Sequence, residues 1–555
     1  MKENKLKTVW VGIAFLTAMH TSLAQNAIDV HLRDVDVKTE PSEKINDNPS
    51  FHDTVKVNTE LKYGMVERKA TSNFKVRPIS PPKIGTGAMD VDKLYNGFVK
   101  AGIIDFRNIP FIDAHYGSKY NRDYVYSVGL NHFGSDLKTA SPDRARFTQS
   151  GLDFSGKRFL KNHVLSADLA YDYNTYRYYG SEIPMDALNT DARKQLFAKG
   201  HLQLAACSKE SNTSIPYHKI MVDYFNIFDR YGMMENRLAF GGKVNPEIDL
   251  LKPYHLKLNL AGTIDWFNYK NDASNFSKNS ILGTVLTSFH YNVGKIKANA
   301  GFNWYFLQDD TSGFRVYPIA DIEYTLIKDV FVAYGKYQRY FQRYDQWAHA
   351  ELNPFFNTSM QLTNTRHLNN FTAGFRGNIS SKINFNLGIE FDQMKNLPMY
   401  VNDLTSFGNR LFTVVTDDVS MFRSYGQFSA ELKKFQFAVK ADYRQYTAYN
   451  ELKAWQMPTF NAGFSGKYNF QNLIHLTAEV YYLGGIYAKE YDQSNQAIAV
   501  ELPGIVDANF GIEYKYSKRW NAFINVNNFL NKQYRRWNNY PNYGLNFLGG
   551  LSCSF

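Results

Sequence analysis

The sequence predicts an all-β fold, a transmembrane antiparallel β-barrel of about 22 strands. Three observations lead to this fold class. The chain opens with an export signal, it continues as alternating strand segments from about residue 95 to its end, and it closes on an alternating strand that ends in Phe555. Side chains in a strand point alternately to the two faces of a sheet, so such segments suit a barrel wall with lipid outside and water inside.

The composition agrees with a barrel and excludes a helical membrane protein. Of the 555 residues, 44% are hydrophobic and 16% are aromatic, with 39 Tyr and 42 Phe. The mean hydropathy of −0.42 is too low for a bundle of helices that each need about 20 apolar residues to span a bilayer. The formal net charge of +11 suits a barrel lumen or anionic lipid head groups. Because Lys and Arg form no cluster, nucleic acid is not an expected partner.

Residues 1–24 have the pattern of a secretory signal peptide. A lysine-bearing start precedes an apolar run from Thr8 to Met19, and the small residues Ser22 and Ala24 follow it. This order is typical of a signal that is removed during export. We therefore expect cleavage between Ala24 and Gln25.

From about residue 95, segments of ten to sixteen residues alternate in polarity. Between Lys161 and Asn174, for example, one face carries Leu165, Ala167, Leu169, Tyr171 and Tyr173, and the other carries Ser166, Asp168, Ala170, Asp172 and Asn174. A soluble propeller would instead repeat every 40–50 residues or so, and no such repeat is present. The segments number about 22 between 97 and 555, and an even number closes an antiparallel barrel without unpaired edges.

The connections are expected to alternate between tight turns and long loops, as in outer-membrane barrels. Tight turns are predicted at 292–295, 380–381 and 433–434. Long loops rich in Asn and Asp are predicted at 181–196, 268–279, 345–366, 395–408 and 489–500.

The last strand is the most specific local feature. One face of the segment 545–555 carries Leu545, Phe547, Leu551, Cys553 and Phe555. A C-terminal strand that ends in Phe resembles the signal that the barrel-assembly machinery recognises. We expect this strand to be required for assembly, and we expect the barrel to contact lipid and lipopolysaccharide of the cell outer membrane.

Both ends of the barrel sequence resemble one family. Residues 525–555 (NVNNFLNKQYRRWNNYPNYGLNFLGGLSCSF) resemble the end of TonB-dependent outer-membrane receptors, and residues 93–113 (KLYNGFVKAGIIDFRNIPFID) resemble a plug-poor branch of that group found in Bacteroidetes-type bacteria. The resemblance implies a 22-stranded barrel that binds or moves a solute.

The chain departs from that family between the signal peptide and the barrel, since 25–94 is too short for the family's plug domain. Pro41, Pro49, Pro78, Pro81 and Pro82 favour an extended periplasmic arm over a compact domain. The barrel, 95–555, is thus expected to have no complete plug, with the arm as a remnant or a substitute. Leu32, Val35 and Val37 lie in a segment that resembles the one through which the family contacts TonB.

The sequence offers no pattern for a catalytic site, a cofactor or a metal. Ser72 and Lys75 form an S-x-x-K motif, but the partner motifs of that catalytic site are absent from the sequence. The two cysteines, Cys207 and Cys553, imply no disulfide framework. Scattered histidines such as His132 and His201 are interpreted as lumenal or interfacial residues. We therefore do not expect an enzyme or a bound cofactor.

Three functions stay open. The first is a receptor or transport barrel for a solute, helped by TonB or by another outer-membrane or periplasmic protein. The second is a plugless structural subunit of a larger outer-membrane assembly. The third, a barrel enzyme, would need a Ser–His or Asp–His pair near one rim.

Overall fold

The computed structural model describes residues 95–555 except 105–106, 120, 140, 142, 184–191, 210–215, 247, 310–311, 329 and 361–362. The signal peptide with Ala24 and Gln25, and the arm at 25–94 with Leu32, Val35 and Val37, lie outside the described residues. Among the described residues, no helix is long and apolar enough to cross a membrane.

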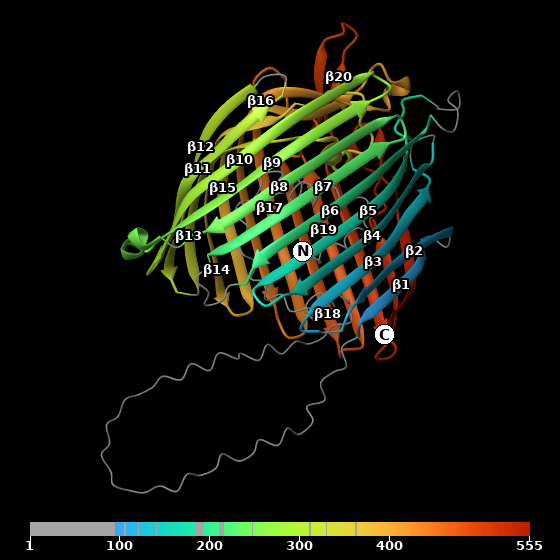
Figure 1. Cartoon of the computed structure of the whole chain (residues 1–555). Coiled ribbons are helices and arrows are strands. Elements are labelled where there is room, and N and C mark those ends of the chain that lie inside the picture. Colours follow the sequence, from blue (N-terminus) through green and yellow to red (C-terminus); the bar gives the residue numbers. More distant parts are fainter. Residues whose placement is uncertain are drawn as a thin grey trace, which may run out of the picture.

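Twenty-two antiparallel strands form one closed sheet (Figure 1). This confirms the predicted fold class and strand number. The first half of the wall comprises β1 (Gly97–Ile104), β2 (Arg107–Gly117), β3 (Tyr124–Leu137), β4 (Ala145–Phe159), β5 (His163–Arg177), β6 (Lys194–Ser208), β7 (Tyr217–Asp229), β8 (Met233–Asn245), β9 (Leu256–Asn271), β10 (Phe276–Val293) and β11 (Ile296–Gln308). The second half comprises β12 (Ser312–Ile327), β13 (Phe331–Gln342), β14 (Thr365–Ser380), β15 (Ile383–Asn402), β16 (Phe412–Glu431), β17 (Phe435–Ala448), β18 (Phe460–Phe470), β19 (Ile474–Gly484), β22 (Ile505–Lys515), β23 (Trp520–Asn527) and β26 (Asn546–Ser554).

The barrel closes where its last strand meets its first. β26 pairs with β1 from Phe98↔Ser554 to Ile104↔Leu548, and with β23 on its other side. The Phe555 carbonyl accepts hydrogen bonds from Asn96 N (2.8 Å) and Gly97 N (3.1 Å). Closure matters because unpaired backbone groups are too costly in hydrocarbon.

The alternation predicted from sequence separates the two faces of the wall. On β5, Leu169 is 47% exposed on the outer face, while Asp168 points inward and accepts a hydrogen bond from Ser155. Leu387 and Ile389 on β15, and Val439 and Tyr443 on β17, are exposed on the outer face in the same way. The outside of the barrel is thus an apolar, aromatic band suited to lipid, and its inside is polar.

This face assignment predicts a labelling pattern in a variant that lacks Cys207 and Cys553. Cysteine introduced for Asp168 or Asp172 should react with water-soluble thiol reagents, whereas cysteine introduced for Leu169 should react poorly because lipid covers it. Labelling of the protein in native membranes tests this. The opposite pattern would place the strand register one residue away.

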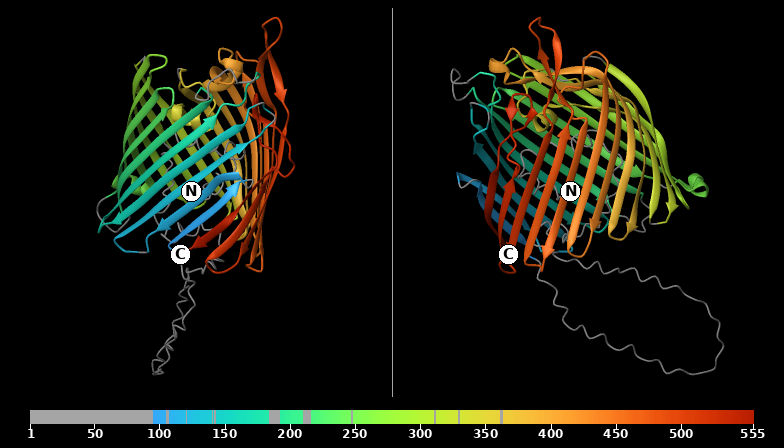
Figure 2. Two further views of the ribbon diagram at one scale, coloured as in Figure 1. Left: turned by 90° about the vertical axis from the view of Figure 1, so that its right-hand side faces the viewer. Right: turned by 180° about the vertical axis from the view of Figure 1, so that it is seen from behind.

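The predicted tight turns are confirmed. Gly294 and Lys295 alone join β10 to β11, and Gly294 adopts the positive φ of +58° that favours glycine in such a turn. The turns at 381–382 and 432–434 are similarly short. All three lie at the end of the barrel that carries the C-terminus (Figure 2).

Several of the predicted long loops were wrong in extent. Segment 268–279 is mostly strand, because β9 and β10 stay paired up to Asn271↔Phe276 and leave four residues between them. Most of 395–408 belongs to β15, which continues to Asn402. Segment 489–500 belongs to a separate hairpin of β20 (Ile486–Tyr491) and β21 (Ala497–Leu502). The extension of β15 is buried rather than exposed, since Leu397, Met399 and Val401 pack in a hydrophobic cluster.

Candidate functional site in the barrel lumen

The end of the barrel opposite the C-terminus is covered from within by the segment that links β13 to β14. We call residues 343–360 the cap. It contains helix α3 (Gln346–Leu352). Asp345 caps the N-terminus of this helix, because its side chain accepts a hydrogen bond from Ala348 N (2.9 Å). Gln346, His349 and Phe356 in the cap are at most 1% exposed. The long connection predicted at 345–366 is confirmed, since β13 ends at Gln342 and β14 begins at Thr365, and much of it is buried.

Aromatic packing joins the cap to two walls of the barrel. Phe356 stacks on Phe197 of β6 at 5.9 Å, and its backbone forms a bridge with Phe412 of β16. Phe355 stacks at 3.8 Å on Tyr540, in the connection between β23 and β26. Because β6 and β16 lie far apart around the barrel, the cap spans the lumen between them.

Charged groups fix the cap to the wall beside the aromatic cluster. Glu235 of β8 accepts a hydrogen bond from Gln346 N (2.8 Å), and Thr358 donates one to Asp229 of β7 (2.6 Å). Arg237 of β8 lies 3.1 Å from Asp265 and 4.0 Å from Asp345. Buried charges must be paired, so displacing the cap would leave several of these groups without their partners.

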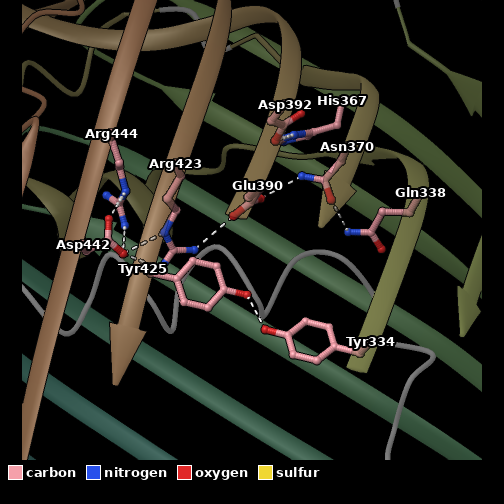
Figure 3. Close-up of polar contacts among 10 residues, drawn as sticks. All are labelled: Tyr334, Gln338, His367, Asn370, Glu390, Asp392, Arg423, Tyr425, Asp442 and Arg444. Atoms are coloured by element: carbon pink, nitrogen blue, oxygen red, sulfur yellow. Dashed lines mark hydrogen bonds and ion pairs between the residues drawn. The ribbon is translucent and has the colours of Figure 1, made fainter. Parts of the chain in front are cut away.

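A row of polar side chains crosses the lumenal faces of β13 to β17 (Figure 3). Arg423 lies at its centre, 3.0 Å from Glu390 and within hydrogen-bond distance of Asp442. The row is extended by Arg444, 2.9 Å from Asp442, and by Asn370, which donates to Glu390 (2.8 Å). The two arginines and two carboxylates balance in charge, so this part of the inner wall is polar and neutral.

Among the described residues, two further histidine pairs lie on opposite faces of the wall. His132 lies 2.8 Å from Ser150 on the outer face of β3 and β4, whereas His367 lies 2.7 Å from Asp392 on the inner wall, with its second ring nitrogen against Gln342. Ser–His and Asp–His contacts therefore exist but lie on different faces. Within the described residues, no three His, Cys, Asp or Glu side chains form a group able to hold a metal.

Of the C-terminal residues singled out from sequence, Phe547, Leu551 and Cys553 lie on β26, and Leu545 and Phe555 flank that strand. Leu551 is 56% exposed to the outside, Phe547 and Phe555 share its face, and Cys553 lies between them. Leu545 lies just before β26. Their role in assembly stays a prediction. Sequence reasoning missed the cap, although Trp347, Phe355 and Phe356 within a predicted loop were a signal that this segment is packed rather than exposed.

The cap contains a histidine that is neutral because it is buried. Burial lowers the pKa of His349 to about 3, and its Nδ1 lies 2.7 Å from the Tyr400 hydroxyl. In an opened, hydrated cap the same ring would titrate near its ordinary pKa of about 6.5. The open form therefore binds more protons between these values, and acidification from about pH 6.5 towards 3 should favour opening.

We expect limited proteolysis within the cap to accelerate as the pH falls through this window, by at most about tenfold per pH unit. Burial raises the pKa of the Asp345 carboxyl, so protonation of that group favours the closed form and opposes the effect. His349→Gln keeps a polar partner for Tyr400 and removes the titration. An acid response that is the same in this variant and in the wild type would contradict the assignment to His349.

Solved structures with very different sequences share this fold. The chain is similar to the siderophore receptor PirA from Acinetobacter baumannii, at 10% sequence identity with a TM-score of 0.65, over 83% of this chain and 80% of that chain. It is also similar to the FrpB iron transporter from Neisseria meningitidis, at 11% identity with a TM-score of 0.64, over 84% and 82%. For a mutant of the ferric enterobactin receptor PfeA from Pseudomonas aeruginosa, the identity is 12% and the TM-score 0.62, over 83% and 80%.

No protein-family model matches the chain, and no curated protein matches it. At 10–12% identity the structural likeness concerns the fold. It confirms the expected barrel fold, which resembles that of the receptors and the transporter named above.

Proposed function

We propose that this chain is an outer-membrane receptor that takes up a solute through a gated lumen. The observation that carries the proposal is the cap. A barrel of 22 strands encloses a wide lumen, and this one is covered at its outer end by residues 343–360, packed between β6 and β16. A segment packed between opposite walls obstructs the lumen, as is required of a receptor that stays closed until a ligand or a partner acts.

The neutral polar row on β13 to β17 supports the same function. Its hydrogen bonds between side chains, such as the one from Asn370 to Glu390, offer alternating donors and acceptors along the inner wall. A structural subunit would have no need of a polar path leading inward from the cap. The structural neighbours are named as receptors and a transporter, which supports uptake over catalysis.

We further propose that energy for opening comes through TonB, by way of the arm segment that contains Leu32, Val35 and Val37. The test compares the growth medium of cells with and without the gene by mass spectrometry, to find solutes whose depletion requires the protein. Val35→Pro should abolish that depletion at unchanged barrel levels. Asp47→Pro, elsewhere in the arm, is the matched control and should leave depletion intact.

The alternative, a structural subunit of a larger assembly, makes a different prediction. No solute would then depend on the protein, and a partner would co-purify with the barrel in a constant ratio. Equal depletion with Val35→Pro and wild type would leave a receptor that does not use this segment.

A further inference from the structure

The outer face of strands β3 to β7, which lie side by side in Figure 1, carries a groove of about 590 Å³. Its floor consists of small residues on adjacent strands. Gly156 of β4 lies opposite Ala167 of β5, and Ala206 of β6 lies one outward-facing position further along. Larger apolar side chains of the same face line its sides: Tyr126, Phe154, Leu204 and Ile220. The groove therefore faces lipid, and the small residues leave room for an apolar chain.

One end of the groove carries an arginine on the outer face. Arg158 is exposed and lies directly opposite Tyr124, the first residue of β3. Because β1 begins and β26 ends at the end of the barrel that carries the C-terminus, β3 begins and β4 ends there too. An outward arginine is costly at the middle of a bilayer and nearly free of cost at its surface. We therefore expect the lipid head groups at the level of Arg158.

Two lysines accompany Arg158 at this end. Lys161 lies in the turn between β4 and β5, and Lys209 N, just after β6, donates a hydrogen bond to the Asn162 carbonyl of that turn (2.9 Å). Asp123, the residue before β3, is an acid at the same end. Cationic side chains thus lie next to the apolar groove at the level where lipid phosphates are expected.

We propose that this groove binds one anionic glycerophospholipid of the periplasmic leaflet. One acyl chain lies along Gly156, Ala167 and Ala206, and the Arg158 guanidinium binds the phosphate. Arginine can bind a phosphate through two parallel, charge-assisted hydrogen bonds. The short turns at this end support the choice of leaflet, because barrels of the outer membrane have their short turns on the periplasmic side, and lipopolysaccharide lies on the other side.

The affinity of the site depends on shape and charge. An acyl chain gains no hydrophobic free energy when it moves from the bilayer into the groove, because lipid tails are as apolar as the groove. Close packing over the small residues and the contact between phosphate and Arg158 therefore distinguish this lipid from its neighbours. The site lies outside the lumen, so it is independent of the proposed uptake.

The test measures retention of dioleoylphosphatidylglycerol by the purified full chain in detergent, by native mass spectrometry. We expect one lipid to be retained at concentrations at which dioleoylglycerol, which has the same chains and no phosphate, is lost. Arg158→Gln should weaken retention by about tenfold. Arg519→Gln is the matched control, because Arg519 is an exposed arginine in the turn between β22 and β23, where its carbonyl accepts from Ser554 N; retention should stay at the wild-type level.

A second pair of variants tests the groove itself. Ala167→Phe fills the floor and should weaken retention by a similar factor with Arg158 still present. Ala300→Phe adds the same side chain at an exposed position on the outer face of β11 and should leave retention unchanged. Without lipid, all four variants should unfold at the wild-type temperature, which shows that they fold normally. Added phosphatidylglycerol should raise that temperature for the wild type but not for Arg158→Gln or Ala167→Phe.

Three results would contradict the proposal. Wild-type retention by both Arg158→Gln and Ala167→Phe would overturn it, because the lipid would then bind elsewhere. Retention of dioleoylglycerol as strong as that of phosphatidylglycerol would overturn the role of Arg158. Lipopolysaccharide that is retained more tightly than phosphatidylglycerol, and is lost from Arg158→Gln, would overturn the choice of a phospholipid.

Discussion

Replacing residues 346–360 with a short Gly-Ser linker is expected to turn a closed barrel into a conducting pore. The deletion removes Phe355 and Phe356 from the aromatic cluster and α3 from its contacts with Glu235. Planar-bilayer recordings of the purified protein should change from no resolved events to discrete openings. Uptake of large antibiotics by cells should rise in parallel, because outer-membrane exclusion then fails at this barrel.

A point substitution tests the packing of the cap without removing the whole segment. Truncating a buried Phe to Ala costs about 3–5 kcal/mol, so Phe356→Ala should shift the closed-to-open ratio by about a hundredfold or more. Phe375→Ala is the control, since Phe375 lies on the outer face of β14 and is 46% exposed. If conductance stays absent after removal of the cap, we expect the arm at 25–94 to close the lumen instead. Recording from a protein that lacks both the cap and residues 25–90 tests this, and such a protein should conduct.

Placing a charge at Leu551 is expected to abolish most assembly of the barrel in the outer membrane. Leu551 points outward from β26, so the new charge would face hydrocarbon. The cost is about 2–4 kcal/mol for Arg at the middle of the bilayer, and less for Asp. Leu551→Arg should therefore reduce the heat-modifiable, folded band more than Leu551→Asp does, and both should fall below wild type.

Deletion of Phe555 acts on the closing hydrogen bonds as well as on the apolar face. It removes the carbonyl that accepts from Asn96 and Gly97, whereas Phe555→Ala retains it. We expect the deletion to be the more severe of the two. Asn546→Asp is an isosteric change on the inner face of the same strand. It adds the same negative charge as Leu551→Asp, but the charge does not face lipid, so this variant should assemble normally. Wild-type levels of folded Leu551→Arg protein would contradict the assigned face of β26.

The barrel wall could be predicted from sequence because its determinants are local. Each strand carries its own alternation, as in Leu169 beside Asp168, and lipid outside with water inside makes that alternation necessary on every strand. The tight turn at Gly294 is likewise determined by only two residues. Loop extents were less predictable, since strands such as β9 and β10 stay paired through segments rich in Asn and Asp that are typical of loops.

The sequence by itself determined the fold class, the strand number and which residues face lipid. A membrane requires every strand, independently of the others, to alternate apolar outward residues with polar inward ones. Only the tertiary structure decided which connecting segment spans the lumen and which charges meet inside it. Phe356 contacts Phe197 across about 160 residues of chain, and Arg423 meets Glu390 and Asp442 only once the register of β15 to β17 is set. Such contacts depend on how the wall curves back on itself, and no local periodicity contains that information.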